Sequence, residues 1–445
     1  MKRKWLLTVL AVVAVGLLAV NAQFSNNFND EFLESASGQA LLQTYGALKS
    51  NYLDDVDDDV IIQGGINGML EALDDEFSYY TDPEVAAQRN QDLQGSFEGI
   101  GAVLSPLNRQ TGEGVKIINV YRDGPAWNAG MQRGDVFMEV DGTNVEEFTP
   151  SEVAAVVRGP SDTTVNIKML RPDEEEPVEF NITRGQIDIV SVESAMLPDN
   201  VGYLSLKTFS NQQLYDQMVE QLELLEEQGA TSLILDMRDN GGGLLNQGIL
   251  VADEFLSEGD IVFERARDVT RRLARADAEM FDLPMVVLVN DNSASASEIV
   301  AGALQENGRA TVIGEQTFGK GVAQNVISLS DGGQLAYVSF EWLTPNRNSI
   351  SETGITPDIF AEDTRTPDFV ALEGQGSPGQ VIEFVIEGEK VGEATVDEEG
   401  EFDFVTAGPD PVYSDTQGEA IVDLETDGAL QTAYETLLTE VAAAN

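Results

Sequence analysis

The residues best suited to chemistry in this chain are a group of serines and a lysine that follows them. Ser293, Ser295 and Ser297 alternate with small residues just before Glu298, and Lys320 comes 25 residues after Ser295, between two glycines. The sequence contains no His and no Cys, so the nucleophile must be a hydroxyl and its base cannot be imidazole. These residue types predict catalysis by a serine with a lysine as its base.

The elements that must position these residues are a strand and a helix. An apolar run at 285–289 predicts a buried strand, and the serines open the helix that follows it. There the positive end of the helix lies beneath any forming oxyanion. A structural alternative stays open, because Ser295 and Glu298 have the spacing of a capping box. Lys320 lies in a turn before the strand-like segment 322–326, where burial would favour its neutral form.

Strands and helices alternate throughout residues 185–365. The pattern predicts strands at 201–205, 232–237, 285–289 and 311–314, helices at 212–228 and from the serines to about 308, an irregular charged stretch before 285, and β-rich structure up to 342. This alternation is typical of an α/β core whose ligands gather beyond the carboxyl ends of the strands. The glycine run 241–243 and the serine run both lie at such strand ends.

Residues 95–184 contain short strands separated by glycine turns. Their order resembles a PDZ domain, a small β-barrel with helices, in which Gly99, Ile100 and Gly101 stand in place of the carboxylate-binding loop. In such a loop successive backbone amides point at a chain-terminal carboxylate, while the ligand adds a strand to an open sheet edge. A plain β-barrel with tight turns is the alternative.

Several motifs together resemble the carboxyl-terminal processing proteases, also called tail-specific proteases. The runs that carry this resemblance are 292–298, 302–310, 314–321 and 354–358, and the similarity extends over residues 38–365. The resemblance implies a serine endopeptidase that selects proteins by their C-termini through the PDZ unit. It also implies hydrolysis by a Ser–Lys dyad through an acyl-enzyme, in a core with a mixed sheet.

The resemblance assigns a role to each matching residue. Ser295 is the nucleophile, Lys320 is the base, and Gln324 orients the lysine. The implied oxyanion hole consists of the backbone amides of Gly242, Gly243 and Ala296. Glu306, 11 residues after the nucleophile, stands where some family members have an aspartate, and we expect only a supporting role for it.

The N-terminus predicts export from the cytoplasm. Lys2, Arg3 and Lys4 precede an uncharged apolar run at 5–20, and small residues follow at a suitable cleavage point. Residues 1–22 are therefore interpreted as a cleaved signal peptide or a retained membrane anchor. A periplasmic, extracellular or membrane-anchored location outside the cytoplasm follows from either.

The remaining regions are assigned from composition. Residues 23–94 read as a helical region, in which the acidic cluster 54–59 is interpreted as a solvated helix start rather than a calcium loop. Residues 366–445 hold 19 acidic side chains and one basic one, and read as a small acidic β-rich module with strands near 381–385 and 401–405 and a closing helix at 430–441. The fold class is thus a multidomain α/β protein.

Charge and composition limit the partners. The net charge of −53 makes nucleic acid and anionic membrane surfaces unfavourable partners. We interpret this charge as an adaptation for solubility or for a salty habitat rather than as an acidic recognition face. We expect protein or peptide substrates with free apolar C-termini and no cofactor or metal, since only oxygen ligands are available. Homo-oligomerisation stays open. Two other functions are a catalytically inactive PDZ-bearing binding protein and a hydrolase of small esters or amides.

Overall fold

The computed structural model describes residues 31–107, 112, 114–172, 174, 176–277, 280–365, 369–386, 389–397, 400–407 and 418–444. The predicted export segment 1–22 lies outside the described residues. The chain divides into two compact units, Met1–Tyr80 and Thr81–Asn445. Within the described part of the chain, no helix is both long and apolar enough to cross a membrane.

The first unit contains the predicted helices. They are α2 (Ala36–Asn51) and α3 (Asp58–Glu71), and the short strand β1 (Tyr79–Thr81) follows at the boundary of the unit. Asp57 Oδ1 accepts hydrogen bonds from the amides of Asp59 and Val60 at 2.9 and 3.4 Å. Because this carboxylate caps α3, the interpretation of the acidic cluster as a helix start is confirmed.

The second unit begins with an antiparallel sheet and the short helices that flank it. Its elements are α4 (Pro83–Leu93), β2 (Ser96–Gly99), β3 (Ala102–Pro106), β4 (Val115–Val120), α5 (Pro125–Ala129), β5 (Val136–Val140), β6 (Thr143–Asn144), α6 (Pro150–Val157), β7 (Thr164–Leu170), β8 (Val178–Thr183) and β9 (Gly185–Asp188). The antiparallel sheet has the order β3-β4-β5-β7-β8, with β6 paired to β5 and with β3 at one edge. β9 pairs with β2, so the strand pairing continues beyond residue 184.

The core of the second unit is a mixed six-stranded sheet. Its strands, in spatial order, are β10 (Val192–Leu197), β11 (Val201–Leu206), β12 (Ser232–Asp236), β15 (Met285–Val289), β16 (Thr311–Gly314) and β19 (Ile359–Phe360). β10 is antiparallel to β11, and the others run parallel. The helices between the strands are α7 (Leu214–Glu227), α8 (Leu245–Glu254) and α9 (Ala296–Glu306).

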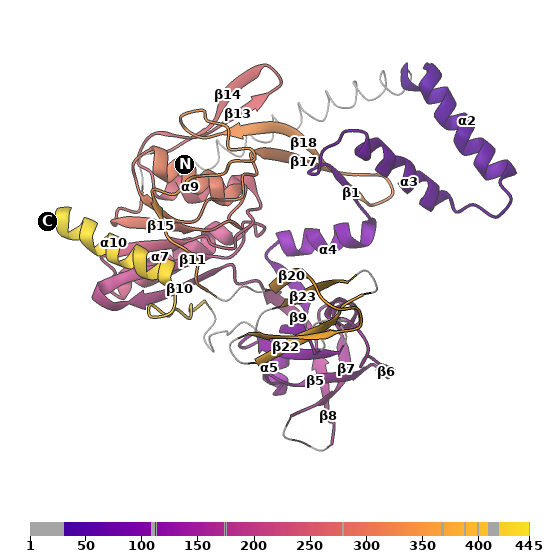
Figure 1. The fold of residues 1–445 in the computed structure, drawn as a ribbon, viewed down its shortest axis with the longest axis horizontal. Helices are drawn as coiled ribbons and strands as arrows, with labels where there is room; N and C mark the ends of the chain where they lie inside the picture. The colour runs from indigo at the N-terminus through magenta and orange to yellow at the C-terminus, as the bar shows by residue number, and fades with distance from the viewer. Residues whose placement is uncertain are drawn as a thin grey trace. The chain divides into compact units, whose positions relative to one another are not determined.

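Helices cover both faces of this sheet, which explains why its strands are apolar on both sides. Leu233, Leu235 and their equivalents in neighbouring strands pack against α7, α8 and α9. Alternate residues such as Ile234 and Val286 pack against α10 (Gly428–Ala444), drawn in yellow in Figure 1. The closing helix predicted at the chain's end therefore forms part of the core of the second unit.

A second core sheet corrects one sequence interpretation. The stretch before residue 285, read as irregular, contains α8 and a hairpin of β13 (Asp260–Ala266) and β14 (Val269–Arg275). Arg271 and Arg272 obscured the β pattern, but both are exposed and pair with acidic residues of β13. β13 also pairs with β18 (Gln334–Leu343), which pairs with β17 (Val322–Ser328).

The segment before α10 holds two strand pairs. β20 (Phe369–Gln375) pairs with β23 (Glu401–Ala407), and β21 (Val381–Ile386) pairs with β22 (Glu389–Thr395), all antiparallel. The two strands expected from sequence near 381–385 and 401–405 are therefore present. The chain rejoins the core at Gly418, whose carbonyl accepts from the Ser194 amide at 2.8 Å.

Candidate active site

Ser295 lies at a strained junction between a strand and a helix. It is the N-cap of α9, six residues beyond the end of β15, with φ 56° and ψ −111°. Positive φ is uncommon for a residue with a Cβ, and such strain persists only where the surroundings enforce it. Here the carbonyl of Asn240 accepts from the Ala294 amide at 3.1 Å and from Ser297 Oγ at 2.7 Å, which fixes the turn on both sides of Ser295.

Ser295 differs from the two neighbouring serines in its contacts and its exposure. Ser293 Oγ donates to the Met237 carbonyl at 2.9 Å, Ser297 Oγ donates to the Asn240 carbonyl, and both serines are fully buried. These hydroxyls hold the turn together, whereas Ser295 is only half-buried. Its exposure leaves Ser295 as the serine of this group that a substrate can reach.

Lys320 lies in the loop between β16 and β17. Its Nζ donates to Gln324 Oε1 at 3.1 Å, and its backbone carbonyl accepts from Trp342 Nε1 at 3.0 Å. Gln324 reaches the lysine because it is the third residue of β17, which begins two residues after Lys320. Since Trp342 is buried and Gln324 lies on a strand, both ends of the lysine are attached to regular structure.

Glu298 connects the two loops. Its Oε2 accepts from the amides of Ser295 and Lys320 at 2.7 and 3.0 Å, and its Oε1 accepts from Thr317 Oγ1 and the Gly319 amide at 2.6 and 2.7 Å. The residue is fully buried. Burial raises the pKa of this carboxyl group, while the four hydrogen bonds oppose that rise. The sequence offered Glu298 only as a partner in a capping box, so its link to the lysine loop was missed.

The glycine turn after β12 lies against Ser295. Gly242 has φ 88°, and a Cβ there would come within 2.8 Å of the Ser295 Cβ and the Ala296 nitrogen. Gly243 has φ 148°, and a Cβ there would come within 2.3 Å of the Phe209 backbone. Only glycine fits these positions. Of the predicted oxyanion residues, Gly242 and Ala296 thus lie beside Ser295, and Gly243 follows Gly242 in the same turn and lies against the Phe209 backbone. The Gly242 amide itself donates to Asn240 Oδ1 at 3.0 Å.

Glu306 has a different set of contacts. Its carboxylate accepts from Thr344 Oγ1 at 2.8 Å, from the Asn346 amide at 2.6 Å and from Asn348 Nδ2 at 3.0 Å. All three donors belong to the turn that follows β18. Glu306 therefore ties α9 to that turn.

A groove marks the PDZ-like unit. It has a volume of ≈ 410 Å³ and runs between β3 and α6 past the predicted loop Gly99, Ile100 and Gly101. Phe137 and Val157 give it an apolar floor. Arg158, just after α6, also lines the groove, and its guanidinium carbon lies 5.2 Å from the centre of the Phe97 ring. Sequence analysis did not select Arg158, because nothing in the sequence places it beside the loop 99–101.

Comparisons with known proteins identify the family. A family model described as peptidase family S41 matches residues 200–361, a PDZ domain model matches 116–171, and a model of the activating protease CtpB N-terminal domain matches 19–85. A carboxyl-terminal-processing protease of Synechocystis sp. is 39% identical over 303 residues, covering 67% of this chain and 70% of that protein. A carboxy-terminal-processing protease of Bartonella bacilliformis is 35% identical over 371 residues, covering 81% and 83%.

A third relative, the carboxy-terminal processing protease CtpA of Bacillus subtilis, is 34% identical over 334 residues, covering 75% of this chain and 70% of that protein. Together with the family models, these relatives place the chain in the class of serine-type peptidases that carry a PDZ domain. This chain belongs to the carboxy-terminal processing protease family. The resemblance drawn from the motifs and the predicted fold class are both confirmed.

Proposed function

We propose that this chain is an exported endopeptidase that captures protein C-termini in its PDZ domain and cleaves them with a Ser295/Lys320 dyad. The observation that carries the proposal is the shared carboxylate oxygen of Glu298, which accepts from the amides of both residues. Two hydrogen bonds to one oxygen keep the serine and the lysine loop in adjacent positions. The half-buried and strained Ser295 is the attacking group.

The chemical steps follow from the two side chains. Neutral Lys320 takes the proton of Ser295 Oγ as this oxygen attacks the scissile carbonyl, and the resulting ammonium gives a proton to the leaving amine. Water then attacks the acyl-enzyme, Lys320 accepts its proton, and Ser295 leaves with a proton from the lysine. Gln324 Oε1 accepts one lysine N–H, which fixes the position of the amine nitrogen and leaves its lone pair free to accept a proton.

The oxyanion of each tetrahedral intermediate needs backbone donors beside Ser295. We assign this role to the amides of Gly243 and Ala296, with Gly242 as a third donor. Because the Gly242 amide donates to Asn240 Oδ1, its contribution requires that this hydrogen bond be shared or exchanged when substrate binds. The positive end of α9 adds to the stabilisation of negative charge.

The PDZ groove supplies selection. The substrate's terminal carboxylate binds the amides of the loop Gly99, Ile100 and Gly101, with the charge of Arg158 beside it. An apolar last side chain packs on Phe137 and Val157, and the preceding residues add a strand to β3, which lies at the edge of its sheet. Export follows from residues 1–22, removed as a signal peptide or retained as an anchor.

The test is cleavage of an unfolded protein with a free apolar C-terminus by the chain from residue 23 onward. Ser295→Ala and Lys320→Ala are expected to abolish cleavage and to leave tail binding intact. Lys207→Ala is the matched control. Among the ion pairs of the described residues, this half-exposed lysine pairs only with Glu193, which lies on the edge strand β10. Tail binding by the wild-type chain without cleavage would instead favour a catalytically inactive binding protein.

A further inference from the structure

We infer that Asp427, at the start of the C-terminal helix, is a positioning residue for peptide hydrolysis. It acts through Arg238 on the turn 238–243, which carries the proposed oxyanion amides. The inference rests on the proposed function. It assigns a part in the reaction to a segment that lies more than a hundred residues beyond the proposed dyad and in which the sequence showed no chemistry.

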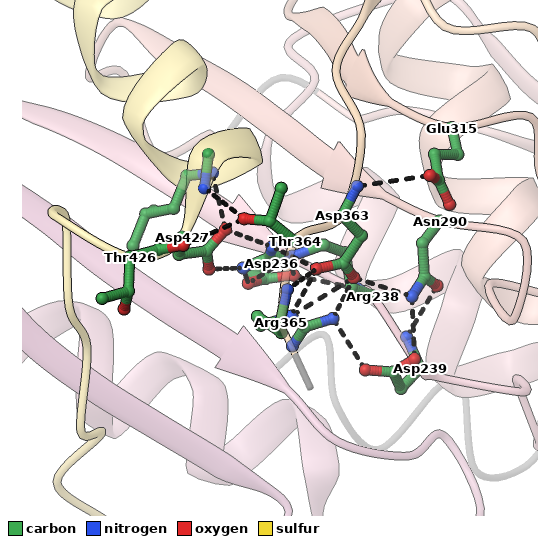
Figure 2. Close-up of polar contacts among 12 residues, drawn as sticks. Asp236, Arg238, Asp239, Asn290, Glu315, Asp363, Thr364, Arg365, Thr426 and Asp427 are labelled. Atoms are coloured by element: carbon green, nitrogen blue, oxygen red, sulfur yellow. Dashed lines mark hydrogen bonds and ion pairs between the residues drawn. The ribbon is translucent and has the colours of Figure 1, made fainter. Parts of the chain in front are cut away.

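The first observation is a buried cation held mainly between two carboxylates, Asp427 and Asp236, with a third, Asp363, at 3.4 Å (Figure 2). The Arg238 guanidinium donates to Asp427 Oδ1 at 2.8 Å and to Asp427 Oδ2 at 2.7 Å. Its other edge donates to Asp236 at 3.0 and 2.6 Å. The Arg238 side chain is 1% exposed. Burial alone would lower the pKa of Arg238, but the two carboxylates more than reverse this effect and raise it.

The second observation is that Asp427 also serves as the N-cap of α10. Its Oδ1 also accepts from the Leu430 amide at 3.0 Å, so the carboxylate caps the first turn of α10. From there α10 packs on β12, β15 and β16 through Leu430, Ala433 and Leu437. The carboxylate that pairs with Arg238 is thus fixed by a helix anchored to the central sheet.

The third observation concerns Asp239, which follows Arg238 in the turn 238–243 and contacts the turn before Ser295. Asp239, the next residue, has φ 58°, and its amide and carboxylate both bond Asn290, at 2.9 and 2.7 Å. Its carboxylate also accepts from Asn292 Nδ2 at 3.2 Å and from Arg365 at 2.7 Å. Figure 2 shows Asp239 and Asn290 on the side of Arg238 away from α10. Arg238 is therefore linked, through the adjacent Asp239, to the turn at Asn290 and Asn292 that precedes Ser295.

The physical argument concerns strain. Asp239, Gly242 and Gly243 all have positive φ, and backbone of this kind is retained only when its surroundings over-determine it. Arg238 is the buried anchor at the start of this turn. Loss of one of its two main partners leaves a buried charge incompletely compensated, which favours displacement of the arginine and of the turn attached to it. Displacement of the oxyanion amides lowers the rate of the chemical step more than substrate binding.

The experiment compares full-length variants on the same unfolded protein substrate. Asp427→Asn is the primary variant, because Asn still caps a helix but carries no charge. We expect kcat to fall at least tenfold while KM stays within twofold. Tyr434→Phe is the control, since it removes another bond of α10 to the core, from the Tyr434 hydroxyl to Asp199 at 2.6 Å, without touching Arg238. Its kcat and KM are expected to match the wild type.

Circular dichroism and thermal melting establish which variants are folded at the assay temperature. Should Asp427→Asn not fold, Arg238→Lys tests the same pair, because lysine keeps the charge but cannot bridge two carboxylates with a planar fork. A folded variant of either kind with wild-type kcat overturns the inference and leaves the proposed function intact. Absence of cleavage by the wild-type chain overturns the proposed function and, with it, this inference.

Discussion

Ser295 and Lys320, 25 residues apart in the chain, donate their backbone amides to one oxygen of the same buried carboxylate, Glu298 Oε2. One group on the first turn of α9 thereby holds the backbone of the proposed nucleophile close to the backbone of the proposed base. The side-chain end of Lys320 is fixed separately, by Gln324. The geometry of the proposed dyad thus depends on Glu298 and Gln324, which have no proton-transfer role in the proposed mechanism.

Glu298→Gln is expected to lower both stability and kcat. The amide nitrogen cannot accept, so at least one of the four hydrogen bonds is lost in a fully buried site, at a cost of about 1–3 kcal/mol. We expect a kcat at least tenfold lower in the folded variant, measured beside urea unfolding. Glu352→Gln, an exposed change in the neighbouring loop, serves as the control. Unchanged kcat in folded Glu298→Gln would contradict this role.

Gly242→Ala is expected to abolish activity, whereas Gly241→Ala is expected to keep it. A Cβ at Gly242 meets the Ala294 carbonyl at 2.5 Å in a backbone conformation with positive φ, but a Cβ at Gly241 has nothing within 4 Å. The two changes are chemically identical and adjacent, so a comparison of their kcat values isolates the turn geometry. Equal activity of the two variants would show that this turn does not supply oxyanion donors.

The pH dependence of cleavage should identify the base. Since only neutral lysine accepts a proton, the rate is expected to rise with pH and then level off. Gln324→Glu places a carboxylate on Lys320 Nζ and favours the ammonium, so it should move this rise to higher pH by about one unit or more. Asn325→Asp adds the same charge at the next position, where the side chain is exposed, and should shift the rise in cleavage rate far less. A flat profile from pH 6 to 10 would exclude Lys320 as the base.

Arg158→Ala is expected to weaken selection of protein C-termini without affecting the chemical step. Removal of the guanidinium beside the loop 99–101 should raise KM about tenfold for a substrate with a free C-terminal carboxylate. The kcat value should stay the same. The KM for a substrate with an amidated C-terminus should rise less than the KM for the free carboxylate. Arg133→Ala, at an exposed arginine, controls for the change in net charge. Equal KM values for free and amidated substrates would refute carboxylate recognition.

Acid should destabilise the core through the carboxylates around Arg238. Burial tends to raise the pKa values of Asp236 and Asp363, but Arg238 and Arg365 outweigh it and hold both values below normal. The stability that these groups contribute is present above the unfolded-state pKa of about 4 and is lost as the pH falls through the folded-state values. Urea unfolding between pH 7 and 3 should therefore show a shallower loss in Asp363→Asn than in wild type. The exposed Asp268→Asn should keep the wild-type slope.

Local patterns in the sequence were sufficient for the fold class and for the proposed dyad. Apolar runs such as Met285–Val289 predict buried strands because both faces of the sheet are covered, and the glycine and serine runs follow strand ends. The hairpin β13–β14 was missed because its arginines pair with neighbouring acids on the surface instead of following an apolar alternation. Strand periodicity is readable only where one or both faces are buried.

Contacts between distant residues were decided by the tertiary structure. The sequence places Glu298 in a capping box, yet its bonds to Thr317, Gly319 and Lys320 depend on how the loop before β17 packs on α9. Arg238 and Asp427 are 189 positions apart, and nothing in either segment indicates the other. Residue type and spacing determine which chemistry is possible, because they act over a few residues. Packing of the sheet and its helices determines which groups meet, because buried charges must find partners wherever the fold brings them.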